Sequence, residues 1–377
     1  MRSIVRVTGV LTLAGLLALA GCSGNPAPAP SATPLGDKTG MSVKAEEMPQ
    51  VQAEEGLTPT VTYPLKEGAE SPTPTPPEDE APIAPPEEGD EAPPEESPTP
   101  EPPSPYIDPP TSLQVQVQGD EGDGDVVGEN DLVSVAFVAW SWGETEPLGG
   151  FNSWGTRQTM VFPLGTQGPV LALSRVVVGQ KVGSKLLAVV PPGLAELNTT
   201  LGAEAGTTSV IYMELIEKFA KDLQAQDDAK PTDETVGPQI DGALGHEAKV
   251  SVPGGVEPPE EFTVQVLATG TGDEVAAGDQ VLVHYAAVDW NGVDGGSTWQ
   301  DGQGPTPIVV PSDAGETVTV FAGLVGLPVG SRVLVTTPAK ERAFAAQAVV
   351  IDLVALPAPV PGLPEVPGDA ISLDLEP

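Results

Sequence analysis

The chain has 377 residues, which is enough for two or three domains of about 100–200 residues each. Lys and Arg number 16 against 54 Asp and Glu, for a formal net charge of -38 at pH 7. Such a polyanion repels phosphate backbones, so nucleic acid is not an expected partner. Cys22 is the only cysteine, so the chain has no pair of thiols for a disulfide.

Residues 1–21 have the three parts of a signal peptide. Arg2 and Arg6 make a positive start, and the apolar run VLTLAGLLALA follows it. The run ends in LAGC, which resembles a bacterial lipobox, in which the cysteine receives diacylglycerol. We therefore expect Cys22 to be the lipidation site of a lipoprotein held at the outer, extracytoplasmic face of the cell membrane. An ordinary secretory signal with a chance cysteine is the alternative.

Residues 22–110 are acidic and rich in proline. Residues 71–110 contain 16 prolines, and residues 41–110 contain 17 acidic residues against two lysines. This composition cannot bury a core, so we expect a disordered, extended linker with polyproline II character. With an anchor at one end, the linker would act as a stalk for folded domains. A solubilising tail is the alternative.

Two β-rich regions follow, at 111–220 and 261–357. Runs such as SLQVQVQGD alternate apolar and polar residues, as half-buried strands do, and glycine-rich turns separate them. We expect a polar linker at 221–260, a loose Pro-rich tail at 358–377, and domains 111–220 and 261–357 that fold independently. These patterns do not exclude an immunoglobulin-like sandwich.

The two β-rich regions look like copies of one domain. Phe137 and Trp142 have the same spacing as Tyr285 and Trp290. VGSKLLAVVPP at 182–192 matches VGSRVLVTTPA at 329–339, and FNSWG at 151–155 matches GSTWQ at 296–300. All five tryptophans lie in these short segments.

The ordered set of motifs resembles the FKBP-type peptidyl-prolyl cis-trans isomerases. The second copy reads VLATGTGDEVAAGDQVLVHYAA, GLVGLPVGSRVLVTTP and VVIDLVAL, and the first reads VSVAFVAWSWGE, GGFNSWG, MVFPLG and VIYMELIEKF. The resemblance implies an α+β fold class. It would comprise two tandem FKBP-like domains, each a twisted antiparallel sheet around a short helix.

The resemblance also implies prolyl isomerisation without a nucleophile, metal or cofactor. The barrier is the partial double bond of the amide, and an apolar, aromatic-lined pocket favours the less polar twisted transition state. The expected partners are Pro-containing polypeptide clients, with the membrane reached through the lipid anchor. His246 and His284 fit no metal site.

Each pocket position of the family falls on a residue of the first copy. The catalytic positions fall on Phe137, Phe151 and Asn152. The substrate-binding positions fall on Met160, Phe162, Val170, Leu173 and Ile211, where Val170 pairs with either Pro169 or Leu171.

In the second copy Tyr285 keeps the catalytic tyrosine, but the Phe-Asp pair falls on Gly295 and Gly296. Ile308 and Ile351 take substrate-binding positions, and the floor Trp falls near Val320. Neither copy keeps the acid of the family motif or the floor Trp. Activity is expected mainly in the first copy, because it keeps Phe137, Phe151 and Phe162 around the expected pocket.

Alternatives remain open at this stage. Trp142, Trp154, Trp290 and Trp299 are more easily explained as core residues than as ligand contacts. An FKBP-fold binding or chaperone lipoprotein with little or no catalysis would show the same motifs, because a fold does not fix an activity. A solute-binding lipoprotein is the third hypothesis, but long helices alternating with strands are missing from the pattern.

Overall fold

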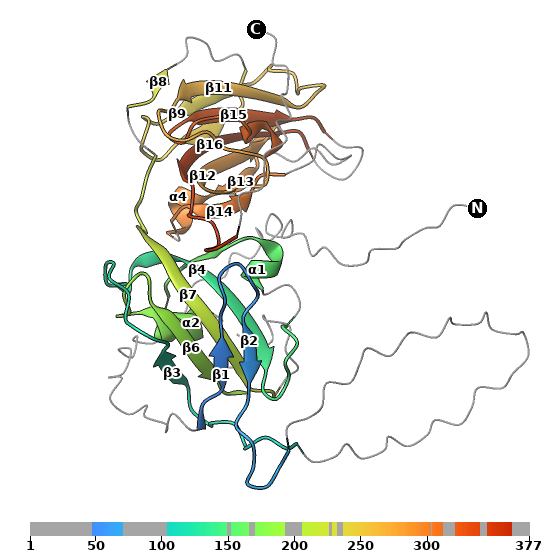
Figure 1. The fold of residues 1–377 in the computed structure, drawn as a ribbon. Coiled ribbons are helices and arrows are strands. Elements are labelled where there is room, and N and C mark those ends of the chain that lie inside the picture. Colours follow the sequence, from blue (N-terminus) through green and yellow to red (C-terminus); the bar gives the residue numbers. More distant parts are fainter. Residues whose placement is uncertain are drawn as a thin grey trace, which may run out of the picture.

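The protein is described by a computed structural model. Its described residues are 47–70, 104–148, 152–165, 170–192, 206–225, 228–231, 237–302, 304–311, 321–339 and 345–363. Two antiparallel sheets follow one another along the chain, one above the other in Figure 1. We call residues 47–225 the first unit and residues 228–355 the second unit.

The first unit contains a five-stranded sheet in the order β3-β6-β7-β4-β5. Its strands are β3 (Gln114–Val117), β4 (Asp131–Ser141), β5 (Met160–Pro163), β6 (Lys185–Val190) and β7 (Ser209–Ala220). Two short helices accompany it, α1 (Ser153–Thr156) and α2 (Val170–Val177). Leu173, Val176 and Val177 of α2 pack into the apolar cluster on one face of this sheet.

The second unit has the corresponding strand order. Its sheet runs β13-β12-β16-β15-β11-β8, and β14 also pairs with β12. The strands are β8 (Lys230–Pro231), β11 (Thr263–Thr269), β12 (Gln280–Asp289), β13 (Asp294–Ser297), β14 (Thr306–Val309), β15 (Arg332–Thr337) and β16 (Gln347–Ala355). Helix α4 (Thr298–Asp301) and the 3-10 helix η4 (Ala322–Leu324) are the helical elements described here. The path β11-β15-β16-β12-β14 matches β3-β6-β7-β4-β5 strand for strand.

The α+β class expected from the sequence is wrong. Strand makes up 41% and helix 7% of the described residues, so this part of the chain is mostly β. The described residues form α-helices of four, eight and four residues. The reason lies in composition, because valine-rich runs with glycine turns favour strands and leave few residues for helix.

A β-hairpin covers the outer face of each sheet. In the first unit, β1 (Gln50–Gln52) pairs with β2 (Thr60–Thr62), and Val61 and Tyr63 pack on the sheet face opposite α2. In the second unit, β9 (Gln239–Asp241) pairs with β10 (Lys249–Ser251), and Ile240 and Val250 pack on β12, β15 and β16. The expectations of disorder through 22–110 and of a bare linker at 221–260 are therefore wrong at these segments.

The two hairpins are themselves a sequence repeat. Residues 48–64 align with 237–253 without a gap, and the strand registers correspond, Gln50 opposite Thr62 and Gln239 opposite Ser251. Gly56 and Gly245 both have positive φ, 74° and 71°, at matching turn positions. The identical pairs are Pro49/Pro238, Gln50/Gln239, Gly56/Gly245, Val61/Val250 and Pro64/Pro253.

The Pro-rich run interrupts the first unit. Leu65 and Tyr106 form an antiparallel bridge, the Lys66 amide donates to the Pro105 carbonyl at 2.9 Å, and the Ile107 amide donates to the Pro64 carbonyl at 3.0 Å. The described segments that precede and follow residues 71–103 are therefore paired with each other. A stalk between anchor and first folded element was expected here, but folded residues lie on both sides of residues 71–103.

The segment after β16 returns to the first unit. Val360 is buried against the hairpin and the outer face of the first sheet, although the tail was expected to be loose. The Ala358 amide donates to the Glu217 carboxylate at 3.2 Å. Gly362 meets Gly56 so closely that a Cβ on Gly56 would lie 2.5 Å from the Gly362 carbonyl oxygen.

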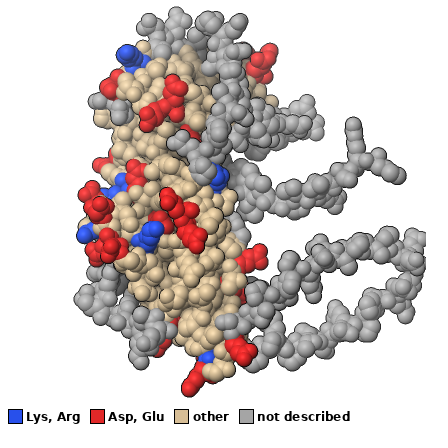
Figure 2. Space-filling model, in the orientation of Figure 1, with Lys and Arg blue, Asp and Glu red and all other residues tan. Residues whose placement is uncertain are grey.

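Charged side chains are intermingled on the face that Figure 2 shows. Two ion pairs of the first unit are Lys185–Glu214 at 3.2 Å and Lys218–Asp131 at 3.3 Å. Partly exposed pairs of this kind typically contribute about 0–1 kcal/mol each. The first unit is therefore stabilised mainly by apolar packing.

Candidate functional site

The predicted pocket positions of the first unit meet in one apolar cluster. Phe137, Phe162, Leu173 and Ile211 are all buried in it, between the sheet and α2. Met160 lies at its perimeter and is only partly buried, as is Leu148. Val170 begins α2, but its side chain and all of Phe151 lie outside the described residues.

Asn152 is the N-cap of α1. Its Oδ1 accepts hydrogen bonds from the Trp154 and Gly155 amides, both at 3.1 Å, and its Nδ2 donates to Thr58 Oγ1 at 3.3 Å. An N-cap side chain satisfies amides that the helix leaves unpaired. Asn152 therefore holds α1 and ties it to the β1–β2 hairpin. Ser153 completes the attachment, because its Oγ accepts from the Phe137 amide at 3.1 Å.

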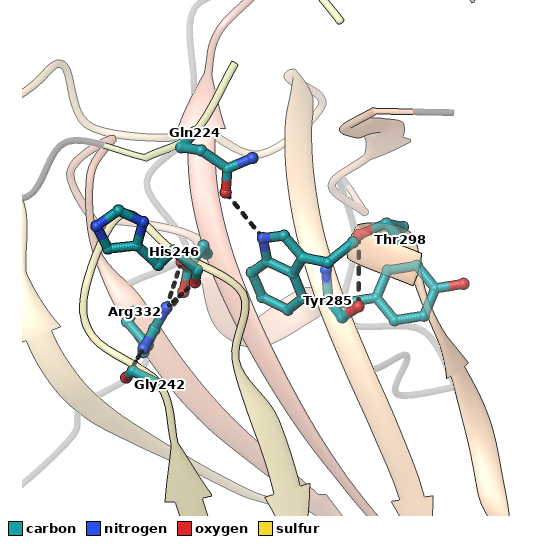
Figure 3. A network of polar contacts seen from close by, with 8 residues as sticks. Gln224, Gly242, His246, Tyr285, Thr298 and Arg332 are labelled. Carbon is teal, nitrogen blue, oxygen red and sulfur yellow. Dashed lines mark hydrogen bonds and ion pairs between the residues drawn. The ribbon is translucent and has the colours of Figure 1, made fainter. Parts of the chain in front are cut away.

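Tyr285 occupies the matching place in the second unit. Its amide donates to Thr298 Oγ1 at 2.9 Å, as the Phe137 amide does to Ser153 (Figure 3). Its ring is half-buried and packs, with Ile308, against the cluster that contains Ile351. Tyr285 and Ile351 are direct cross-strand partners.

Two predicted equivalences between the units need correction. Asn152 pairs with Val138 and caps α1. Ser297 pairs with Ala286 and occupies the N-cap position of α4 without a side-chain capping bond. The Phe-Asp positions therefore fall on Gly296 and Ser297. Gly295 was one residue out of register because the loops before the helices differ in length.

The late-strand position shifts as well. Phe137 faces Met213 as Tyr285 faces Ile351, so Ile351 corresponds to Met213 and not to Ile211. The period of two residues in a strand keeps both on the same face, which hid the slip.

A buried polar network that the sequence did not reveal lies behind the second unit's site. Arg332 makes two hydrogen bonds to the Asp352 carboxylate, at 2.6 and 2.8 Å. It also donates to the Gly242 and His246 carbonyls of the β9–β10 hairpin, at 2.8 and 3.0 Å (Figure 3). Burial raises the pKa of the Asp352 carboxyl, and the Arg332 guanidinium opposes that rise. All partners are internal, so this network serves structure.

His284 has hydrogen-bond partners that the sequence did not reveal. It is 2% exposed, its Nδ1 bonds to the Thr298 hydroxyl at 2.9 Å, and its Nε2 bonds to the Leu223 carbonyl at 3.0 Å. Its ring stacks on Trp299 with centroids 5.0 Å apart. The Trp299 indole donates to Gln224, which Figure 3 labels, at 2.9 Å. His284 and Trp299 thus fix the chain that leaves the first unit.

Trp142 lies beside an open hollow of about 520 Å³ on the first unit. The hollow is lined by Asp108, Pro109, Pro110, Thr111, Trp142, Pro191, Pro192, Gly206, Thr207 and Thr208. The indole donates to the Ile107 carbonyl at 3.1 Å, and Trp290 donates likewise to Val256 at 3.0 Å. Trp142 and Trp290 are partly buried against apolar clusters, and each hydrogen-bonds an earlier segment of the chain. Their packing fits a structural role.

Searches for other kinds of site were confined to the described residues. No group of three or more His, Cys, Asp or Glu side chains suited to a metal is present among them. In the same part of the chain no helix is long and apolar enough to cross a bilayer. Cys22 lies outside the described residues.

Comparisons with known proteins gave structural likenesses only. No protein-family model and no curated protein matches the sequence. Solved structures of FKBP-type proteins are similar to parts of it. FkpA from Escherichia coli is 24% identical with a TM-score of 0.24, over 29% of this chain and 49% of FkpA, so the match spans about half of that protein.

Two plant proteins give similar values. The N-terminal domain of FKBP42 from Arabidopsis thaliana is 17% identical with a TM-score of 0.26, over 30% of this chain and 96% of that domain. The three FKBP domains of wheat FKBP73 are 16% identical with a TM-score of 0.23, over 65% of this chain and 94% of theirs. At TM-scores this low, none of these likenesses indicates a function for the chain.

Proposed function

We propose that the chain carries two copies of an FKBP-like domain and that the first copy binds Xaa–Pro segments and catalyses their cis-trans isomerisation at a modest rate. The observation that carries the proposal is the meeting of Phe137, Phe162, Leu173 and Ile211 in one apolar cluster with Met160 partly exposed at its perimeter. Prolyl isomerisation needs such an apolar contact surface and no titrating group.

The chemistry follows from the amide. Rotation about the Xaa–Pro bond removes its resonance, and the twisted transition state is less polar than either planar isomer. An apolar contact for the proline ring therefore stabilises the transition state more than the ground state. Met160 would supply this contact, because its flexible thioether side chain adapts to a ring.

The second copy is expected to contribute little catalysis. The register places Thr306 opposite Val283 as Met160 stands opposite Val135, so a hydroxyl side chain takes the place of Met160. Gly296 takes the place of Phe151, which removes a ring.

Peptide binding without catalysis is the second candidate. The close burial of Phe137, 4% exposed, and Ile211, 0% exposed, favours it, because only perimeter side chains then contact a peptide.

The experiment measures cis-to-trans relaxation of an Xaa–Pro peptide with the full chain, with Met160→Ala and with Val117→Ala. Both side chains lie at the perimeter of the same cluster, but on β5 and β3, at opposite edges of the sheet. We expect Met160→Ala to lower kcat/KM about tenfold, equivalent to ~1.4 kcal/mol, and Val117→Ala to leave it unchanged. A wild-type rate equal to that of buffer, with peptide binding retained, would establish the binding-only candidate instead.

We also propose that Cys22 is lipidated and holds the protein at the outer face of the membrane. The LAGC sequence after an apolar run supports this. Detergent-phase partitioning of wild type and Cys22→Ser tests it. We expect only the wild type to enter the detergent phase, and equal partitioning with loss of the signal segment in both would contradict the proposal.

A further inference from the structure

The side chain of Gln280, in the second unit, makes two hydrogen bonds to Thr159, the residue before Met160. Thr159 Oγ1 donates to Gln280 Oε1 at 2.9 Å, and Gln280 Nε2 donates back to the Thr159 carbonyl at 3.1 Å. Thr159 is only 6% exposed. One amide thus satisfies both a side-chain and a backbone group of a single residue, and β5 begins at the next residue, Met160.

An apolar cluster shared by both units surrounds this contact. Leu132 and Val161 of the first unit pack with Leu282 and Val354 of the second, and Ala225 joins them. Leu132 and Leu282 are 0% exposed. Because these side chains are buried against one another, the two units are fixed relative to each other at this point. The hydrogen bonds between Thr159 and Gln280 therefore keep one geometry.

Strand β5 therefore faces two ways. Side chains alternate along a strand, and Val161 packs in the shared cluster while Met160 and Phe162 belong to the cluster of the candidate site. The backbone of β5 pairs with β4, and Gln280 hydrogen-bonds the Thr159 carbonyl directly before the strand begins. The place of Met160 is thus set from both units.

We propose that the second unit positions the first unit's site, with Gln280 as a positioning residue that acts through Thr159 on Met160. This inference rests on the proposed function of the first copy. It assigns a role to a unit whose own site has Gly296 and Thr306 in place of a ring and a methionine. Gln280 touches no substrate in this scheme; it fixes the edge strand that does.

The test uses the full chain and compares steady-state kinetics of Thr159→Val, Thr159→Ser and Gln280→Ala with those of wild type. Valine keeps the shape of threonine without the hydroxyl, and serine keeps the hydroxyl. We expect Thr159→Val to raise KM about fivefold with kcat little changed, the size of effect that loss of one neutral hydrogen bond implies. Gln280→Ala loses both hydrogen bonds and should raise KM at least as much. Thr159→Ser should stay close to wild type, and the double variant should be no worse than Gln280→Ala.

Gln116→Ala is the matched control, a partly buried glutamine on the opposite edge strand β3. Thermal unfolding of each variant gives its folded fraction. Unchanged KM in Thr159→Val and Gln280→Ala, or losses that only follow the folded fraction, would overturn the inference and leave the proposed function standing. A wild-type rate equal to buffer would instead overturn the proposed function itself.

Discussion

Two cross-strand ion pairs occupy the same register position in the two sheets but differ in burial. Lys185 faces Glu214 and Arg332 faces Asp352. The side chains of the first pair are 48% and 14% exposed, and those of the second 4% and 2%. The β9–β10 hairpin explains the difference, because its Gly242 and His246 carbonyls cap the Arg332 guanidinium.

We predict that Arg332→Met lowers the free energy of unfolding by about 3–5 kcal/mol, because it leaves the Asp352 carboxylate buried and unpaired. Lys185→Met, the matched control, should cost less than about 1 kcal/mol. Urea unfolding measures both. The loss in Arg332→Met should shrink as the pH falls, because protonation of Asp352 removes the unpaired charge. Equal losses in the two variants would contradict this account of burial.

Tyr63 links the first hairpin to the sheet. Its hydroxyl donates to the Ser141 and Glu144 carbonyls at 2.9 and 2.8 Å. Burial, and after it the Glu144 carboxylate, raises the pKa of Tyr63 well above its ordinary value. A folded-state pKa above the unfolded one means that this contribution to stability is complete below about pH 10 and declines as the pH rises further.

We therefore predict that Tyr63→Phe lowers the free energy of unfolding at pH 8 by about 1–2 kcal/mol, because the hydroxyl proton shared between the two carbonyls is lost. Between pH 10 and pH 11 the wild type should lose stability more steeply than the variant. Urea midpoints measured across this range test the sign. Parallel curves for wild type and variant would show that Tyr63 ionises equally in the folded and unfolded chain.

At the scale of elements, each sheet depends on its hairpin. Apolar side chains of β4, β6 and β7 lie on the sheet face opposite α2, and Val61 and Tyr63 of the hairpin bury them. A two-stranded hairpin is only marginally stable alone, so the packing stabilises hairpin and sheet together.

We predict that Val61→Ala, at a position 3% exposed, costs about 2 kcal/mol in the free energy of unfolding, from lost burial and the cavity left behind. Leu57→Ala at the hairpin turn, 58% exposed, should change it by less than about 0.5 kcal/mol. Equal values for these two variants would mean that the hairpin does not pack on the sheet in solution.

The sequence predicted the long strands and missed the hairpins for a physical reason. The alternating or continuous apolar runs of β4 and β12 give strong patterns, whereas β1 and β9 are three residues long and each has one partly buried side chain between two exposed ones. Proline and acid around β1 suggested disorder, because composition reflects the average of a segment and not the few residues that pack. The hairpin repeat becomes evident only when residues 48–64 are compared with 237–253.

The candidate site was predicted in part. Phe137, Met160, Phe162, Leu173 and Ile211 meet as the motifs implied, because strand period and order fix which side chains share a face. Two predicted equivalences, of Gly295 with Phe151 and of Ile351 with Ile211, were wrong because loop lengths differ between the copies. Gln280 and His284 could not be predicted, because their partners lie about 60 to 120 residues away in the chain.

At the scale of the whole molecule, contacts among the described residues join the two units and the segment that follows them. The two units share the cluster of Leu132 and Leu282, His284 holds the connecting chain at Leu223, and Val360 returns to the first sheet. The sequence predicts domains that fold independently and leaves open whether they pack together; these contacts show that the two units pack on one another. This packing places β5, and so Met160, between the candidate site and the second unit.

The central claim is that an Xaa–Pro peptide binds the first unit at Met160, and methionine methyl resonances test it directly. The described residues contain three methionines, Met48 on the outer face, Met213 in the buried cluster and Met160 at its perimeter. With methyl-labelled methionine and assignment by Met160→Ala, titration with an Xaa–Pro peptide should give a saturable shift at Met160 and none at Met48. A saturable shift at Met48 with Met160 unmoved, or no shift at Met160 at saturating peptide concentrations, would contradict the account.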